Sequence, residues 1–179
     1  MKQDFGIVGR PAPELRVPVW LSGVESGGLQ IAEIEQPVIY VFGFQSWCPG
    51  CHSHGFPALQ KTQEKLRAKG LDGQVKFIVV QTAFEGHDIN TADAARESVA
   101  RYGLTDIALG HDSGSWPTLM ADYRTGGTPW TVIIGPRPAR IVAADGFSVD
   151  PDTAVVTIER LLAGSPGTAP DATAGTGPA

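Results

Sequence analysis

Continuous apolar runs alternate with amphipathic stretches along most of this chain. The run PVIYVFGF (37–44) is rich in β-branched and aromatic residues, and VKFIVVQT (75–82) repeats that composition. Such runs are typical of strands buried on both faces in the middle of a sheet. A third run, Trp130–Ile134, follows the sequence GGTP, and the GPRP turn after it predicts a hairpin return along 141–144. The pattern therefore predicts a sheet with a buried centre.

Amphipathic stretches around these runs predict helices. The first extends from about Cys48 to Lys69, and Gly70 supplies its C-terminal cap. The second begins at Asn90 or Thr91 and continues to Tyr102. A short helix is expected at 119–124, and a last one over 150–162, opened by an Asp cap and a Pro at the first position. The order is β-α-β-α and then β-β-α, which predicts an α/β fold.

The two ends of the chain have a different composition. Residues 1–28 are rich in Pro and Gly and are expected to form an irregular lead-in, with short strands near 17–21 and 29–34. Residues 164–179 are almost entirely Gly, Pro, Ala and Thr, which cannot bury a core, so we expect a disordered tail. Residues 1–163 are therefore expected to form one domain.

Composition argues against several classes of partner. A length of 179 residues suits a single domain, and the hydrophobic share of 42% is ordinary for a globular protein. Fourteen Lys and Arg against nineteen Asp and Glu give a net charge of −5, without a basic cluster, which argues against nucleic acid and anionic membrane as partners. The apolar runs are strand-sized, and none at the N-terminus has the length of a signal peptide. If Met1 is the native start, we expect a cytoplasmic protein with reduced thiols.

The stretch WCPGCHSH (47–54) holds both cysteines and two of the four histidines. It fits three chemistries: a C-x-x-C redox pair, the C-x-x-C-H pattern that attaches c-type haem, and a metal site formed by Cys48, Cys51, His52 and His54. A haem would also need a distal ligand such as Met and an oxidising compartment, so we expect no haem. Closed zinc sites usually draw two ligands from each of two arms, which four ligands within seven residues do not provide.

Four segments together favour the redox pair. They are GRPAPEL (9–15), YVFGFQSWCPGC (40–51), Pro57 in the following helix, and YRTGGTPWTVII (123–134). In these segments the chain resembles thioredoxin-like proteins, most closely the TlpA/ResA type of the AhpC/TSA–redoxin group, over about 9–162. The resemblance implies a thioredoxin-like fold, with a central mixed β-sheet flanked by helices and the active site at a strand–helix junction. It also implies a cis peptide bond at Thr128–Pro129, packed against the cysteines.

The chemistry expected of this arrangement is thiol–disulfide exchange. Cys48 at a helix N-terminus is placed where backbone N–H groups and the helix dipole favour an anion, so it would attack a substrate disulfide as a thiolate. Cys51, one turn later, would resolve the mixed disulfide. We expect no cofactor beyond the redox-active disulfide. The expected partners are a disulfide-containing substrate and an upstream thiol reductant, and cytoplasmic residence favours reduction of the substrate.

Residues around the cysteines are expected to contact the substrate. Trp47, with Trp130 and Phe44, would form apolar surface around the disulfide. Pro49 needs no N–H bond in the first helical turn. The loop with Thr128 and Pro129 would present its backbone to the substrate, as in the resembling family.

The sequence departs from the family at the proton carrier that assists the second cysteine. Thioredoxins have a buried Asp at the position of Phe42, and ResA-like proteins have a Glu at the position of His54. His54 and Glu85 are the candidate replacements, with Glu85 favoured because a carboxylate desolvated beside the disulfide would titrate near neutrality. The helix proline also lies one residue later than usual, and a bulge near Gly55 would absorb the extra residue.

Two alternatives stay open. A peroxiredoxin-like peroxidase would carry Pro-x-x-x-Thr-x-x-Cys, but Val41 and Gln45 occupy the Pro and Thr positions here. A non-enzymatic Cys/His metal-binding module is the second alternative. His87, His111 and Asp112 are expected in loops, as surface polar residues.

Overall fold

The computed structural model describes residues 4–164, which form a mixed six-stranded sheet in the order β1-β4-β3-β2-β5-β6. The strands are β1 (Val19–Ser22), β2 (Val38–Phe44), β3 (Val75–Thr82), β4 (Ile107–Asp112), β5 (Trp130–Ile134) and β6 (Val142–Gly146). The central strands β2, β3 and β4 run parallel, whereas β1, β5 and β6 pair antiparallel to their neighbours. The mixed sheet expected from the sequence is therefore confirmed.

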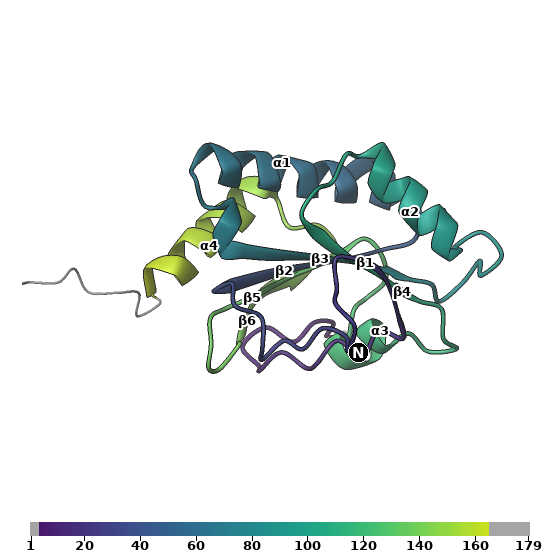
Figure 1. The fold of residues 1–179 in the computed structure, drawn as a ribbon, viewed down its shortest axis with the longest axis horizontal. Helices are drawn as coiled ribbons and strands as arrows, with labels where there is room; N and C mark the ends of the chain where they lie inside the picture. The colour runs from purple at the N-terminus through teal and green to yellow at the C-terminus, as the bar shows by residue number, and fades with distance from the viewer. Residues whose placement is uncertain (1–3, 165–179) are drawn as a thin grey trace, which may run out of the picture.

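Helices cover both faces of this sheet (Figure 1). They are a π-helical turn (Cys51–Gly55), α1 (Phe56–Ala68), α2 (Ala92–Arg101), α3 (Thr118–Tyr123) and α4 (Pro151–Gly164), and a 3₁₀ turn (Asp72–Gln74) precedes β3. Helices α1, α2 and α4 lie on one face, whereas α3 and the N-terminal lead-in lie on the other. Within the described residues no helix is both long enough and apolar enough to cross a bilayer.

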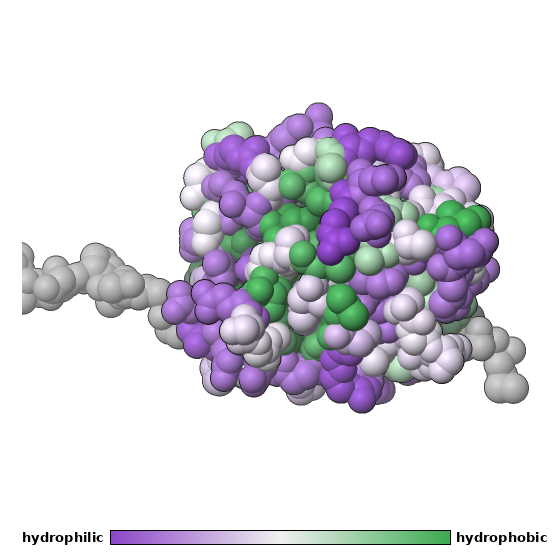
Figure 2. Space-filling view, turned by 45° about the vertical axis from the view of Figure 1, so that its right-hand side comes forward, coloured by the Kyte–Doolittle hydropathy of each residue, from purple (hydrophilic) through white to green (hydrophobic). Residues whose placement is uncertain are grey.

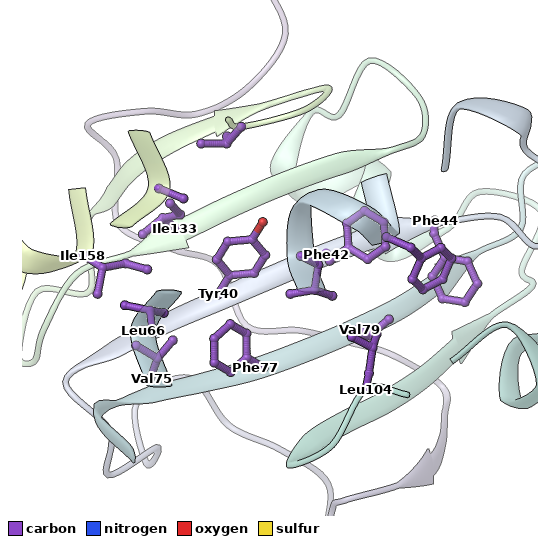
Figure 3. Packing of buried hydrophobic residues seen from close by; sticks show 14 of the residues in the cluster. Tyr40, Phe42, Phe44, Leu66, Val75, Phe77, Val79, Leu104, Ile133 and Ile158 are labelled. Atoms are coloured by element: carbon purple, nitrogen blue, oxygen red, sulfur yellow. The ribbon is translucent and has the colours of Figure 1, made fainter. Parts of the chain in front are cut away.

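The central strand β2 is buried on both faces, which explains its continuous apolar sequence. Because side chains alternate along a strand, Tyr40 and Phe42 belong to the cluster beneath α1 and α4, whereas Ile39 and Val41 belong to the cluster beneath α3 and the lead-in. Figure 3 shows the first cluster, in which Phe42 and Tyr40 point from the strand into the layer of α1 and α4. The sheet is thus the middle layer between two apolar cores.

The predicted helices are present, but some of their ends differ: α1 begins at Phe56, after the π-helical turn, and α4 continues to Gly164, beyond the predicted end at 162. The hydroxyl of Thr91 caps α2 by accepting from the Ala94 N–H at 3.2 Å. The carboxylate of Asp150 accepts N–H groups in the first turn of α4, and Gly70, after α1, adopts a left-handed φ of 68°. The expected tail begins at Gly164, which ends α4, and its other residues, 165–179, lie outside the described part of the chain.

Two sequence-based expectations are wrong. His111 and Asp112 are not loop residues, because they end strand β4 and are buried. The Asp112 carboxylate accepts the N–H and the hydroxyl of Thr118, at the start of α3, at 2.6 and 2.8 Å. The strand was missed because such partners of its polar end cannot be recognised from the local sequence. The strand expected at 29–34 is a coil, whose buried Ile31 N–H is bound by the Glu14 carboxylate at 2.7 Å.

The segment just before β2 is held by one buried arginine. The guanidinium of Arg140 donates to four backbone carbonyls, at Ile34, Gln36, Pro37 and Gly135. Arg140 is buried, and its hydrogen bonds to the Ile34 and Gly135 carbonyls are buried, whereas those to Gln36 and Pro37 are partly buried. One side chain therefore ties the segment before β2 to the turn between β5 and β6.

We expect Arg140→Met to lower the free energy of unfolding by at least about 2 kcal/mol, because each buried acceptor left without a partner costs about 1–3 kcal/mol. Urea unfolding measures the change. Arg137→Met is the matched control, since Arg137 is exposed three residues earlier. An equal loss in both variants would show that the carbonyl contacts contribute nothing particular.

Candidate functional site

The two cysteines lie at the junction between β2 and the first helix. The Cys48 N–H donates to the Gln45 carbonyl at 3.1 Å, which turns the chain out of the strand. The Cys51 N–H donates to the carbonyl and to Sγ of Cys48, at 3.1 and 3.3 Å. Both thiols are free, and Cys48 is 7% exposed whereas Cys51 is 0% exposed. Of the two sulfur-bearing residues, only Cys48 therefore has surface that a molecule in solvent can reach.

The loop before β5 packs against this dithiol. The Thr128–Pro129 peptide bond is cis, as expected from the sequence. The Cys48 thiol lies 3.5 Å from the Thr128 carbonyl oxygen, so the sulfur faces the backbone of this loop. Two segments far apart in the sequence thus form one site at the carboxyl end of β2.

The helix that follows Cys48 is irregular at the predicted place. Residues Cys51–Gly55 form a π-helical turn, which absorbs the extra residue before Pro57 and confirms the expected bulge. Gly55 lies so close to its neighbours that a methyl group there would be 2.8 Å from Phe42 Cζ and from Pro129 Cβ. The turn therefore packs directly on the cis-proline loop.

Buried amide side chains hold the segment between Phe44 and Cys48. The Gln81 Oε1 accepts the Ser46 N–H at 3.0 Å and also the Ser46 hydroxyl. The Asn90 Oδ1 accepts the Trp47 N–H at 3.1 Å, and its Nδ2 donates to the side-chain carbonyl of Gln45 at 3.3 Å. Sequence reasoning missed these roles. The available signal was a Gln near the end of an otherwise apolar strand.

His111 extends this network. The Gln81 Nε2 donates to the Thr91 carbonyl at 2.8 Å and to His111 Nδ1 at 3.1 Å. Burial lowers the pKa of His111, which favours the neutral ring, whose Nδ1 can accept a hydrogen bond. His111 therefore orients the Gln81 amide that binds Ser46.

His52 is a structural residue of the site. Its Nε2–H donates to the Ser46 carbonyl at 2.6 Å, its Nδ1 lies 2.9 Å from the Tyr102 hydroxyl, and its ring stacks on Phe56 and Tyr102. Both ring nitrogens are thus occupied. Across residues 4–164 no cluster of three or more His, Cys, Asp or Glu side chains is placed to hold a metal ion.

The structure does not place either expected proton carrier against the cysteines. Glu85 is exposed. The expectation that its carboxylate is desolvated beside the dithiol is therefore wrong. His54 is also exposed; its Nδ1 bonds the Ser53 hydroxyl at 2.7 Å, and it lines a surface hollow with Pro57 and Asp150. Burial meanwhile raises the pKa of Cys51 far above that of an ordinary thiol.

The apolar surface near the dithiol differs from the expected one. Trp47 is 44% exposed and Pro49 is exposed, but Phe44 and Trp130 are buried and belong to the core. Phe147 instead covers Trp130 from outside, with ring centroids 4.9 Å apart. Figure 2, turned by 45° so that the right-hand side of Figure 1 comes forward, shows hydrophobic residues among polar ones across the middle of the visible face.

Known structures resemble this arrangement. A thioredoxin-like superfamily protein has 29% identity and a TM-score of 0.70, over 89% of this chain and 98% of the other. A thiol-disulfide isomerase from Corynebacterium glutamicum has 29% identity and a TM-score of 0.67, over 85% and 96%. A putative thiol:disulfide interchange protein DsbE from Chlorobium tepidum has 22% identity and a TM-score of 0.54, over 87% and 96%.

These similarities establish the expected thioredoxin-like fold. No protein-family model matches the chain, and no curated protein matches it. The assignment to the TlpA/ResA type stays a prediction.

We expect Gly55→Ala to disturb both the fold and the dithiol, because its methyl group would overlap Phe42 and Pro129. Overpacking of this kind costs about 1–3 kcal/mol in unfolding free energy. The added methyl group should push the π-helical turn away from the proline loop, and the reaction of Cys48 with an aromatic disulfide should then be slower. Gly73→Ala is the control, since a methyl group there would meet nothing within 4 Å. Wild-type stability and reactivity in Gly55→Ala would refute the close packing.

Proposed function

We propose that this protein is a thiol–disulfide oxidoreductase that reduces disulfides of protein or small-molecule substrates with Cys48 and Cys51. The observation that carries the proposal is the unequal exposure of two neighbouring thiols, with the more exposed Sγ 3.3 Å from the backbone N–H of the other cysteine. The similarity to a protein described as a thiol-disulfide isomerase supports it. Within the fold, we assign the chain to the TlpA/ResA type.

In the first step the Cys48 thiolate attacks one sulfur of the substrate disulfide. A bond forms between Cys48 Sγ and that sulfur, the substrate S–S bond breaks, and the second substrate sulfur leaves as a thiolate that takes up a proton. The Cys51 N–H contributes here, because it points at Cys48 Sγ and stabilises negative charge on it.

In the second step Cys51 attacks Cys48 Sγ and breaks the mixed disulfide. The products are a Cys48–Cys51 disulfide and the second substrate thiol, so two electrons have passed from the protein dithiol to the substrate. An upstream thiol reductant then restores both cysteines. The direction rests on the expected reducing compartment, and the reaction uses no cofactor besides this disulfide.

The substrate would bind across the surface next to Cys48. Trp47 and Pro49 flank the sulfur and are exposed, so they can contact a substrate chain. The half-buried loop with Thr128 and Pro129 lies opposite, and its backbone can pair with an extended peptide. We propose these residues as the substrate-binding set.

The trapping of partners separates the roles of the two cysteines. With a lysate of cells as the source of disulfide substrates, Cys51→Ser should accumulate mixed disulfides that dithiothreitol releases, because attack proceeds and resolution does not. Cys48→Ser should trap almost nothing, and the double Ser variant sets the background. Equal trapping by both single variants would contradict the assigned roles.

Two further readouts on the wild-type protein distinguish the alternatives. Fast catalytic turnover of hydrogen peroxide would indicate a peroxidase. Stoichiometric, tightly held zinc together with failure to form the intramolecular disulfide would indicate a metal-binding module. Under the proposed function neither result is obtained.

A further inference from the structure

An apolar hollow lies next to the loop that faces Cys48. Its volume of about 440 Å³ is within the range of small-ligand pockets. Its walls come from the lead-in, from α3 and the segment before it, and from the loop that leads to β5: Phe5, Trp116, Met120, Ala121, Thr125 and Gly126. Asp4 and Arg124 also line it, with one charge of each sign, so the lining has no net charge. An uncharged, apolar group therefore suits this hollow.

The hollow is continuous with the dithiol site through the proline loop. Gly126, which lines the hollow, precedes Thr128 by two residues, and the Thr128 carbonyl oxygen lies 3.5 Å from Cys48 Sγ. Two residues of chain span at most about 7 Å. An extended substrate chain advances about 3.3 Å per residue. A polypeptide held on Cys48 by its cysteine therefore reaches the hollow within a few of its own residues.

Exposed aromatic rings surround the glycines of this loop. A methyl group on Gly126 would lie 2.7 Å from Phe147 Cζ and 3.0 Å from Phe5 Cδ2, so both rings pack on this glycine. Phe5 and Phe147 are nevertheless 48% and 49% exposed, and Trp116 is 67% exposed. Apolar side chains that gather at the surface are typical of binding sites. Together with Trp47 beside Cys48, they provide apolar contact area on the same side of the molecule as the loop.

The lead-in wall of the hollow is held in place by hydrogen bonds. The Gly6 N–H donates to the Arg124 carbonyl at 2.9 Å, and the Ile7 N–H donates to the Asp145 carboxylate at 2.6 Å. The Arg124 guanidinium donates to the Asp4 carbonyl at 2.7 Å. These bonds hold the lead-in beside α3 (Figure 1). The hollow is thus formed before a ligand binds, which reduces the ordering cost of binding.

We propose that the preferred substrates are disulfides of polypeptides, and that the hollow binds an aromatic or large aliphatic side chain of the polypeptide. This side chain lies about two to four residues from the cysteine that reacts with Cys48, a distance set by the rise of an extended chain. Phe5, Trp116 and Met120 determine specificity and are not catalytic residues. The proposal rests on the proposed oxidoreductase function and names its substrate class.

The test uses peptides with one cysteine in a mixed disulfide with thionitrobenzoate. The Cys48 thiolate attacks the peptide sulfur, a Cys48–peptide disulfide forms, and the bond to the aromatic sulfur breaks, which releases coloured thionitrobenzoate as a thiolate. One series carries a single Phe at successive positions on either side of the cysteine, in a chain of Gly and Ser. Matched peptides carry Ala in its place. The glutathione derivative with the same leaving group is the small-molecule control, because it has no apolar side chain to fill the hollow.

We expect the second-order rate constant of the wild-type protein to be highest with Phe about two to four residues from the cysteine. The gain over the Ala peptide should be about 3- to 10-fold, the effect of burying roughly half of an aromatic side chain. Trp116→Ala and Phe5→Ala should each remove most of this gain and leave the rate with the glutathione derivative unchanged. Val156→Ala is the matched control, since Val156 is a 43% exposed apolar residue on α4. Urea unfolding verifies that each variant is folded.

The outcomes separate the two proposals. If the wild-type protein releases thionitrobenzoate from no derivative faster than free glutathione does, the oxidoreductase function fails. If it reacts but shows no preference for Phe at any position, or if the preference persists in both Trp116→Ala and Phe5→Ala, the role of the hollow is refuted while the function stands. Sedimentation of the wild-type protein provides a further check. A dimer that Trp116→Ala dissociates would assign the hollow to a second copy of the chain and would also overturn the proposal.

Discussion

The site depends on satisfying backbone groups in a partly buried turn. The chain leaves the sheet at Ser46 and Trp47, between the fully buried β2 and the first helix. Neither residue's N–H group has a backbone partner within a helix or strand. Buried N–H groups without partners are costly. Gln81 and Asn90 supply the partners from β3 and from the residues before α2. The position of Cys48 is thus set by polar side chains of neighbouring elements, and its exposure follows from that.

The same turn explains how a buried sulfur and a partly exposed one coexist within three residues. The π-helical turn starts at Cys51 and brings Gly55 against Phe42 and Pro129, so Cys51 lies inside while Cys48 remains at the edge. This arrangement favours an ordered reaction in which one sulfur meets the substrate and the other acts only from within. It also makes the buried environment of Cys51 the feature that controls the second step.

Sequence reasoning succeeded where the signal was local. The C-x-x-C pair is a short motif, and the resemblance to thioredoxin-like proteins added the cis Thr128–Pro129 bond and the irregular turn before Pro57, both of which the structure contains. It failed where partners are distant: Gln81 and Ser46 lie 35 residues apart, and a glutamine in an apolar strand does not reveal which backbone it binds. It also misplaced Glu85, because sequence does not tell whether a side chain after a strand turns toward the site or toward water.

The central claim is that Cys48 and Cys51 form one reversible two-electron couple. A titration with reduced and oxidised glutathione at pH 7 tests it directly, with thiol counting by alkylation and mass spectrometry and with the emission of exposed Trp47 as a parallel signal. We predict a single transition from two thiols to one intramolecular disulfide, in which both signals coincide. Persistence of two thiols, or accumulation of separate glutathione adducts on the cysteines, would contradict the account.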